Sequence, residues 1–138
     1  MKVAMLLALA SLSIAQAAEP TGTLTLACKG ERVTHPGGSD PGSDDLKEPI
    51  SMGIIVNFEA RTLNGFGEDW SYPNPIRIHN VTETLIPFGY TQTREEGGKS
   101  IQGSIDRVTG DVNAVISFPL YVPRLIYSLQ CKPTQRMF

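Results

Sequence analysis

The sequence has no excess of positive charge. Its 138 residues include 12 Lys and Arg against 14 Asp and Glu. Removal of residues 1–17, for which the case is given below, takes away Lys2 and leaves 11 basic residues against the same 14 acids. Proteins that bind nucleic acids carry a basic footprint. The charge balance therefore argues against a nucleic-acid partner.

Long apolar runs are also scarce. The most conspicuous one, Val3–Ile14, is interrupted only by two serines, and it is shorter than the roughly 20 residues that span a bilayer. It follows Met1-Lys2 and precedes a small-x-small site, Ala15-Gln16-Ala17. This order is typical of a secretory signal peptide; an N-terminal core helix and a membrane anchor are the alternatives. We expect a signal peptide over residues 1–17, a single domain over residues 18–138, and no membrane insertion after cleavage.

Cysteine is limited to two residues, Cys28 and Cys131. In an exported protein an even pair of cysteines predicts a disulfide. A metal site would need more ligands than these two, and a catalytic cysteine would need a partner that we cannot name. A lipid anchor on Cys28 would leave Cys131 unpaired. We therefore predict a Cys28–Cys131 disulfide.

Recognisable catalytic and metal-binding motifs are absent. The sequence has no Gly-x-Ser-x-Gly elbow, and its glycine-rich stretches do not lead from a strand into a helix, as a phosphate cradle requires. The two histidines, His35 and His79, are far apart. Acidic residues between Asp40 and Glu48 suggest calcium, but their spacing fits no EF-hand. We predict no catalytic residue, no metal site and no cofactor.

No segment after Ala18 has a convincing helical period. Alternation of apolar and polar residues predicts strands instead, at 22–30, 50–58, 76–90 (as one strand or two), 100–118 (as a hairpin) and 125–131. Residues 31–49 are rich in turn formers and charge, which predicts a surface loop. Asn64-Gly65 predicts a tight turn.

This spacing of short strands is typical of an all-β domain: an antiparallel sandwich or a small closed barrel of about six to eight strands. Cys28 and Cys131 fall on the apolar faces of the first and last strands. A disulfide between them would join these strands as neighbours.

Within the Asp106–Gly110 segment of the hairpin, an Asp can bind free backbone N–H groups and Gly110 suits a positive φ. We therefore assign Asp106 a structural role.

Aromatic residues gather in the irregular connection 65–75. Phe66, Trp70 and Tyr72 lie there among prolines that forbid regular strand pairing. Loops at the mouth of a barrel are common places for ligands, so these three residues are the predicted contact surface for a ligand or partner. The alternative is that Trp70 packs into one end of the core.

Gly103-Ser-Ile-Asp-Arg-Val-Thr-Gly110 and the C-terminal Cys131-Lys-Pro-Thr-Gln-Arg-Met-Phe138 resemble segments of small exported proteins of proteobacteria, and Ile50-Ser-Met-Gly-Ile-Ile-Val-Asn-Phe58 is similar to them too. The resemblance implies a bacterial, periplasmic or secreted setting. It implies no activity.

Taken together, these features lead us to expect an exported, non-enzymatic β-domain that binds a small molecule or a protein partner in the bacterial envelope. The alternative is a structural or stress-protective envelope protein without a discrete ligand site. A hydrolase with an unrecognised site ranks third.

Overall fold

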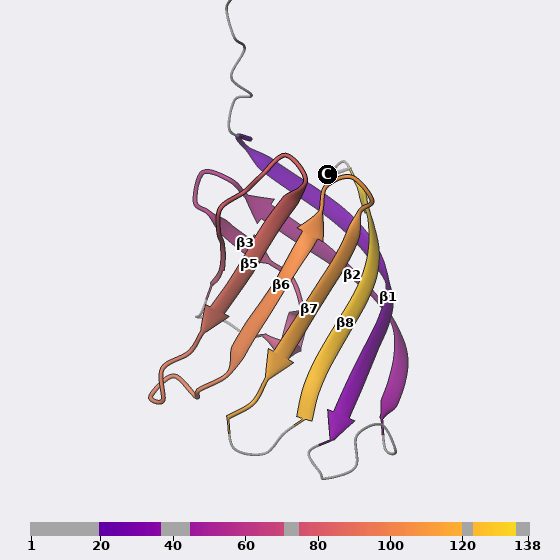
Figure 1. Cartoon of the computed structure of the whole chain (residues 1–138), viewed down its shortest axis with the longest axis vertical. Coiled ribbons are helices and arrows are strands. Elements are labelled where there is room, and N and C mark those ends of the chain that lie inside the picture. The colour runs from indigo at the N-terminus through magenta and orange to yellow at the C-terminus, as the bar shows by residue number, and fades with distance from the viewer. Residues whose placement is uncertain (1–19, 37–44, 71–74, 120–122, 135–138) are drawn as a thin grey trace, which may run out of the picture.

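The chain folds as an eight-stranded antiparallel barrel in the part described by the structure, a computed structural model (Figure 1). The described residues are 20–36, 45–70, 75–119 and 123–134. They form strands β1 (Thr23–Pro36), β2 (Leu46–Asn57), β3 (Thr62–Asn64), β4 (Ile76–Ile78), β5 (Leu85–Thr91), β6 (Ser100–Asp106), β7 (Asp111–Ser117) and β8 (Pro123–Pro133), and the 3₁₀ turn η1 (Gly67–Asp69).

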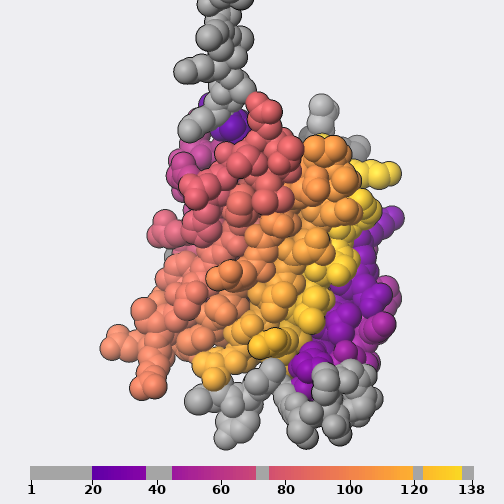
Figure 2. Space-filling view, in the orientation of Figure 1, coloured from indigo at the N-terminus to yellow at the C-terminus, as the bar shows by residue number. Residues whose placement is uncertain are grey.

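Each strand pairs with the next one along the chain, and β8 pairs with β1 to close the barrel. In Figure 2 the strands β5 to β8 form a continuous, closely packed wall. The prediction of an all-β antiparallel fold is confirmed, and of its two forms the structure is the closed barrel.

The predicted disulfide is present. Cys28 in β1 lies directly opposite Cys131 in β8, with their Cα atoms 4.0 Å apart. The two residues are 103 positions apart in sequence, and cross-linking so long a loop stabilises the fold by about 4–5 kcal/mol where loop entropy dominates. Because the disulfide engages both cysteines, neither is free in this state of the protein to bind a metal, act in catalysis or carry a lipid anchor.

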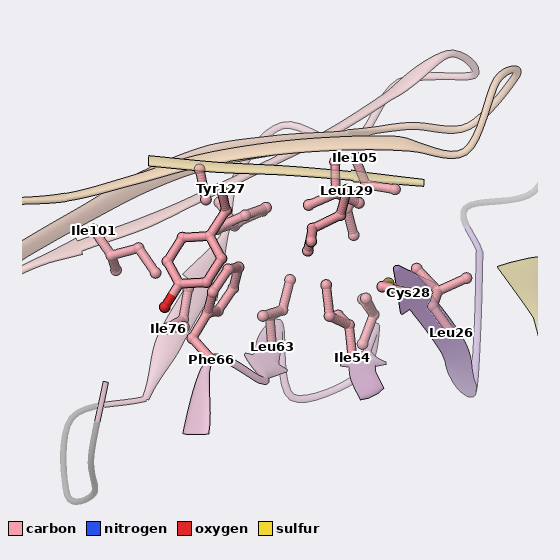
Figure 3. Close-up of a cluster of buried hydrophobic side chains, with 14 of the residues drawn as sticks. Leu26, Cys28, Ile54, Leu63, Phe66, Ile76, Ile101, Ile105, Tyr127 and Leu129 are labelled. Atoms are coloured by element: carbon pink, nitrogen blue, oxygen red, sulfur yellow. The ribbon is translucent and has the colours of Figure 1, made fainter. Parts of the chain in front are cut away.

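Side chains from all eight strands fill the interior of the barrel, and Figure 3 shows part of this core. The interior is filled because alternate residues of each strand point inward. This alternation is clearest in β7 and β8, where every second residue is buried. An eight-stranded barrel is just wide enough for its inward side chains to fill it. Fully buried large residues include Ile54, Val56, Leu63, Ile76, Ile86, Ile101, Val112, Ile116 and Tyr127.

Part of the predicted loop over residues 31–49 is strand, so that prediction is wrong at both of its ends. β1 continues to Pro36 and β2 begins at Leu46, and the two strands are paired over this length. The alternation that marks a strand is lost here because Arg32 and Glu48 stand at inward-facing positions, where the pattern requires apolar residues. Residues 37–44 lie outside the described part of the chain.

The tight turn predicted at Asn64-Gly65 lies instead before β3. The tight turn lies at residues 58–61, between β2 and β3, whereas Asn64 is the last residue of β3. The Oδ1 atom of Asn57 accepts a hydrogen bond from the Ala60 N–H, and Arg61 takes a positive φ of 57°. An arginine rarely occupies that conformation, so the sequence carries no turn signal at this place.

The antiparallel order places the connections at two opposite ends. The β2–β3, β4–β5 and β6–β7 turns share one end, here called the short-turn end; the connections β1–β2, β3–β4, β5–β6 and β7–β8 share the other, the long-connection end.

The β6–β7 turn is built as predicted. Asp106 accepts hydrogen bonds from the N–H groups of Val108 and Thr109, and Gly110 has a φ of 80°.

Candidate functional site

The aromatic connection after β3 folds inward at the long-connection end. Phe66 and Trp70, which flank η1, are only 3% and 6% exposed. The Phe66 ring packs edge-on against Tyr127 with 4.9 Å between centroids, and Trp70 packs edge-on against Tyr90. The burial of Phe66 and Trp70 supports the packing role that the sequence left open. Tyr72 lies outside the described residues.

Between these two aromatic residues, Asp69 joins a cluster of polar side chains. Arg32 donates from Nη1 to Asp69 Oδ2 at 2.7 Å and from Nη2 to Glu48 Oε2 at 2.6 Å. The Tyr127 hydroxyl donates to the same Asp69 oxygen. In the barrel wall Arg32 lies opposite Glu48 on one side and Tyr127 on the other. The cluster therefore ties η1 to β1, β2 and β8.

The electrostatics of this cluster favour a structural role over proton transfer. Burial, followed by the hydrogen bond to Asp69, raises the pKa of the Tyr127 hydroxyl well above its usual value. Hydrogen bonds to Asp69 and Glu48 raise the pKa of Arg32 above its already high ordinary value. Both groups keep their protons at neutral pH, so neither is poised to act as a base. The Nε atom of Arg32 is buried without a partner, which makes the cluster incompletely satisfied.

The two histidines stay apart. Nδ1 of His35 lies 2.5 Å from Oδ1 of Asp45 at the long-connection end, where β1 ends and β2 begins. His79 follows β4 at the short-turn end and is exposed. Among the described residues no three His, Cys, Asp or Glu side chains come together as a metal site would need.

The outer wall carries a hollow of about 650 Å³, here called the outer groove. It runs over β8, β1 and β2 beside the disulfide. Its lining has more apolar than polar surface. The lining residues are Thr25, Leu26, Ala27, Cys28, Lys29, Ser51, Met52, Gly53, Gln130, Lys132 and Thr134.

Small side chains create the outer groove. Ala27 of β1 is paired with Gly53 of β2 and with Lys132 of β8. Because Ala27 and Gly53 are both exposed, outward-facing and nearly without side chain, the wall is thin between the flanking Lys29 and Lys132. A Cβ atom added at Gly53 would meet only the Leu26 carbonyl oxygen, at 3.8 Å, so the space above it is open.

Lys29 and Lys132 border this groove, and within the described residues neither forms an ion pair. Asp111 and Glu31 are the nearest acids on this wall by strand register: Asp111 is paired with Gln130, and Glu31 lies two residues beyond Lys29. Neither acid lines the groove. On a chain whose formal net charge is −2, the groove is a locally cationic surface.

Sequence reasoning did not find the outer groove. Its signal is a set of small residues at outward positions on adjacent strands, and that set is visible only once the register between β1 and β2 is known.

Comparison with known proteins adds no relative: no protein-family model, curated protein or solved structure matches this chain. In the described part of the chain, no helix has the length and apolar character needed to cross a membrane.

Proposed function

We propose that this chain is an exported, non-enzymatic binding domain that takes up a small anionic amphiphile in its outer groove. The observation that carries the proposal is the groove itself: a mostly apolar hollow with two lysines at its border and no carboxylate in its lining. The secretory pattern of residues 1–17 and the Cys28–Cys131 disulfide support a periplasmic or secreted location, since disulfides persist in oxidising compartments.

The size and chemistry of the groove favour a small molecule. Ligand sites usually measure about 300–1,000 Å³ and are mainly apolar, with a few polar groups that orient the ligand. Here Ala27, Gly53 and the methyl group of Thr25 would contact an alkyl chain, and Lys29 or Lys132 would hold a carboxylate or a similar head group. An amphiphile of this kind combines both features in one molecule.

The test is a calorimetric titration of the purified, oxidised protein with decanoate. A parallel titration uses 1-decanol, the uncharged counterpart. We expect saturable binding of decanoate and weaker binding of 1-decanol. Replacing both Lys29 and Lys132 by Gln should remove the preference for decanoate. Saturable binding that ignores the charge of the ligand would contradict the assignment of the two lysines.

Gly53→Val is the sharper variant. Its side chain would occupy the floor of the groove, so decanoate affinity should fall at least about tenfold, or 1.4 kcal/mol. Valine also suits a strand better than glycine, so stability should rise by about 0.5–1 kcal/mol. A binding loss without unfolding would locate the ligand in the groove. Undiminished binding in Gly53→Val would place it elsewhere.

If decanoate and related amphiphiles do not bind at all, the binding proposal fails. The filled interior and the covalently closed barrel would then favour the alternative, a structural or stress-protective envelope protein.

A further inference from the structure

A second hollow, of about 390 Å³, lies at the short-turn end of the barrel, away from the outer groove. Its lining comes from the β2–β3 turn, from β4 with the β4–β5 turn, and from the start of the described chain. Pro20, Phe58, Arg61, Ile78, Asn80, Val81 and Thr82 line it. Ile78 belongs to the core, and the half-buried Phe58 and Val81 pack against it. These two residues give the hollow a small apolar floor, although its lining as a whole exposes more polar than apolar surface.

Hydrogen bonds fix the walls of this hollow. The Arg61 carbonyl accepts from the Ile78 N–H at 3.1 Å, which holds the β2–β3 turn against β4. Nη1 of Arg107 donates to the Thr82 carbonyl oxygen and holds the β4–β5 turn from the neighbouring β6–β7 turn. The hollow therefore exists without a ligand to shape it.

Two of its rim residues adopt an unusual backbone conformation. Arg61 and Asn80 have positive φ angles of 57° and 34°. Asparagine tolerates this region, but for arginine it is uncommon and costs free energy. Glycine would fit the backbone of the β2–β3 turn better than arginine does.

The polar groups of the rim differ in availability. The Thr82 hydroxyl already accepts from the Leu85 N–H and lies within bonding distance of the Leu85 carbonyl. Arg61 is exposed and forms no ion pair with a described residue. Its guanidinium and the Asn80 amide are thus the donors that remain. The lining contains no carboxylate, although Glu59 and Glu83 are close along the chain.

We propose that this hollow is a second binding site, which takes a small carboxylate with an aromatic or branched apolar body. The planar guanidinium of Arg61 donates two parallel hydrogen bonds to the carboxylate, a geometry that lysine cannot reproduce. The Asn80 amide adds a third donor. The apolar body of the ligand lies on the half-buried Phe58 and Val81.

The test uses benzoate, with benzamide as its uncharged analogue, and follows backbone amide chemical shifts of the oxidised protein by NMR. We expect saturable shifts at Asn80, Val81 and Thr82 with benzoate and at least tenfold weaker binding of benzamide. Absence of saturable shifts at these amides, or equal binding of the two probes, would overturn the proposal.

Arg61→Gly separates recognition from folding. Glycine accepts the positive φ at no steric cost, so the melting temperature should not fall, whereas benzoate binding should be lost. Arg61→Lys, which keeps the charge without the two-pronged geometry, should bind with intermediate affinity.

Arg94→Ala, in the β5–β6 connection at the opposite end, is the matched control and should bind as the parent protein does. If Arg61→Gly bound benzoate normally, Arg61 would not be a ligand contact and the site would be wrongly assigned.

Discussion

The two ends of the barrel differ in whether their charged side chains have partners within the protein. At the long-connection end, Arg32, Glu48, Asp69 and Tyr127 bind one another, and Phe66 and Trp70 pack beside them. At the short-turn end, Arg61 borders a hollow and has no acidic partner among the described residues.

This contrast separates two uses of charged side chains. A cluster whose charged groups are paired with one another, as these are apart from Arg32 Nε, contributes to stability and leaves few charged groups for a ligand to contact. A charged group that faces an open, apolar-floored hollow is available for recognition. Phe66 and Trp70, which the sequence analysis singled out, lie at the long-connection end, whereas both proposed ligand sites lie elsewhere.

The largest effect should follow from Trp70→Ala. Removing a buried Trp side chain leaves a cavity, and such changes cost about 3–5 kcal/mol of unfolding free energy. Chemical denaturation measures the loss. Val108→Ala, at a position 76% exposed in the β6–β7 turn, is the control and should change stability by less than about 0.5 kcal/mol. A loss below 1 kcal/mol for Trp70→Ala would return Trp70 to the role of a surface contact.

An intermediate effect should appear in alkali. An unfolded tyrosine loses its proton near pH 10, whereas the folded pKa of Tyr127 is raised by burial and by its hydrogen bond to Asp69. Above pH 10 the folded state therefore holds more protons than the unfolded state, and stability falls as the pH rises. Denaturation between pH 8 and pH 11 should show this slope, and Tyr127→Phe should have a smaller one. Equal slopes would show that Tyr127 does not contribute.

The smallest effect concerns Asp106 at the short-turn end. Hydrogen bonds from the N–H groups of Thr109 and Val108 lower the pKa of this carboxyl. Because the folded pKa is depressed, its contribution to stability is present above the ordinary value, near pH 4, and is lost as the pH falls through the folded pKa.

Amide shifts of Val108 and Thr109 should therefore titrate with a midpoint below that of an ordinary aspartate, and Asp106→Asn should abolish the titration. A midpoint at or above the ordinary value would contradict the hydrogen bonds of this turn.

Much of the fold could be predicted from local pattern. The alternation from Ile50 to Asn57 marks β2, and the Asp106–Gly110 segment marks a hairpin whose turn chemistry requires those residues. The disulfide followed from two cysteines on apolar faces. Each of these signals lies within a few consecutive residues or depends on a single pair of cysteines, so it can be recognised from the sequence.

The rest depends on contacts that no local pattern reveals. β1 and β2 extend further than expected because Arg32 is matched by Glu48 across the strands and by Asp69 from η1, 37 residues away. Whether Trp70 is buried depends on how the β3–β4 connection folds back over the barrel. Both hollows require the register of strands that are distant in sequence.

The meander topology gives the Cys28–Cys131 bond a particular meaning. Among the described strands, seven pairings join segments that follow one another in the chain, and only the pairing of β1 with β8 does not. The sulfur bridge joins that one pair of strands, so every pair of neighbouring strands in the barrel is connected covalently, either by the chain or by the disulfide. The strands therefore form a covalently closed ring. If the hydrogen bonds between any one pair of neighbouring strands break, the two strands stay tethered to each other.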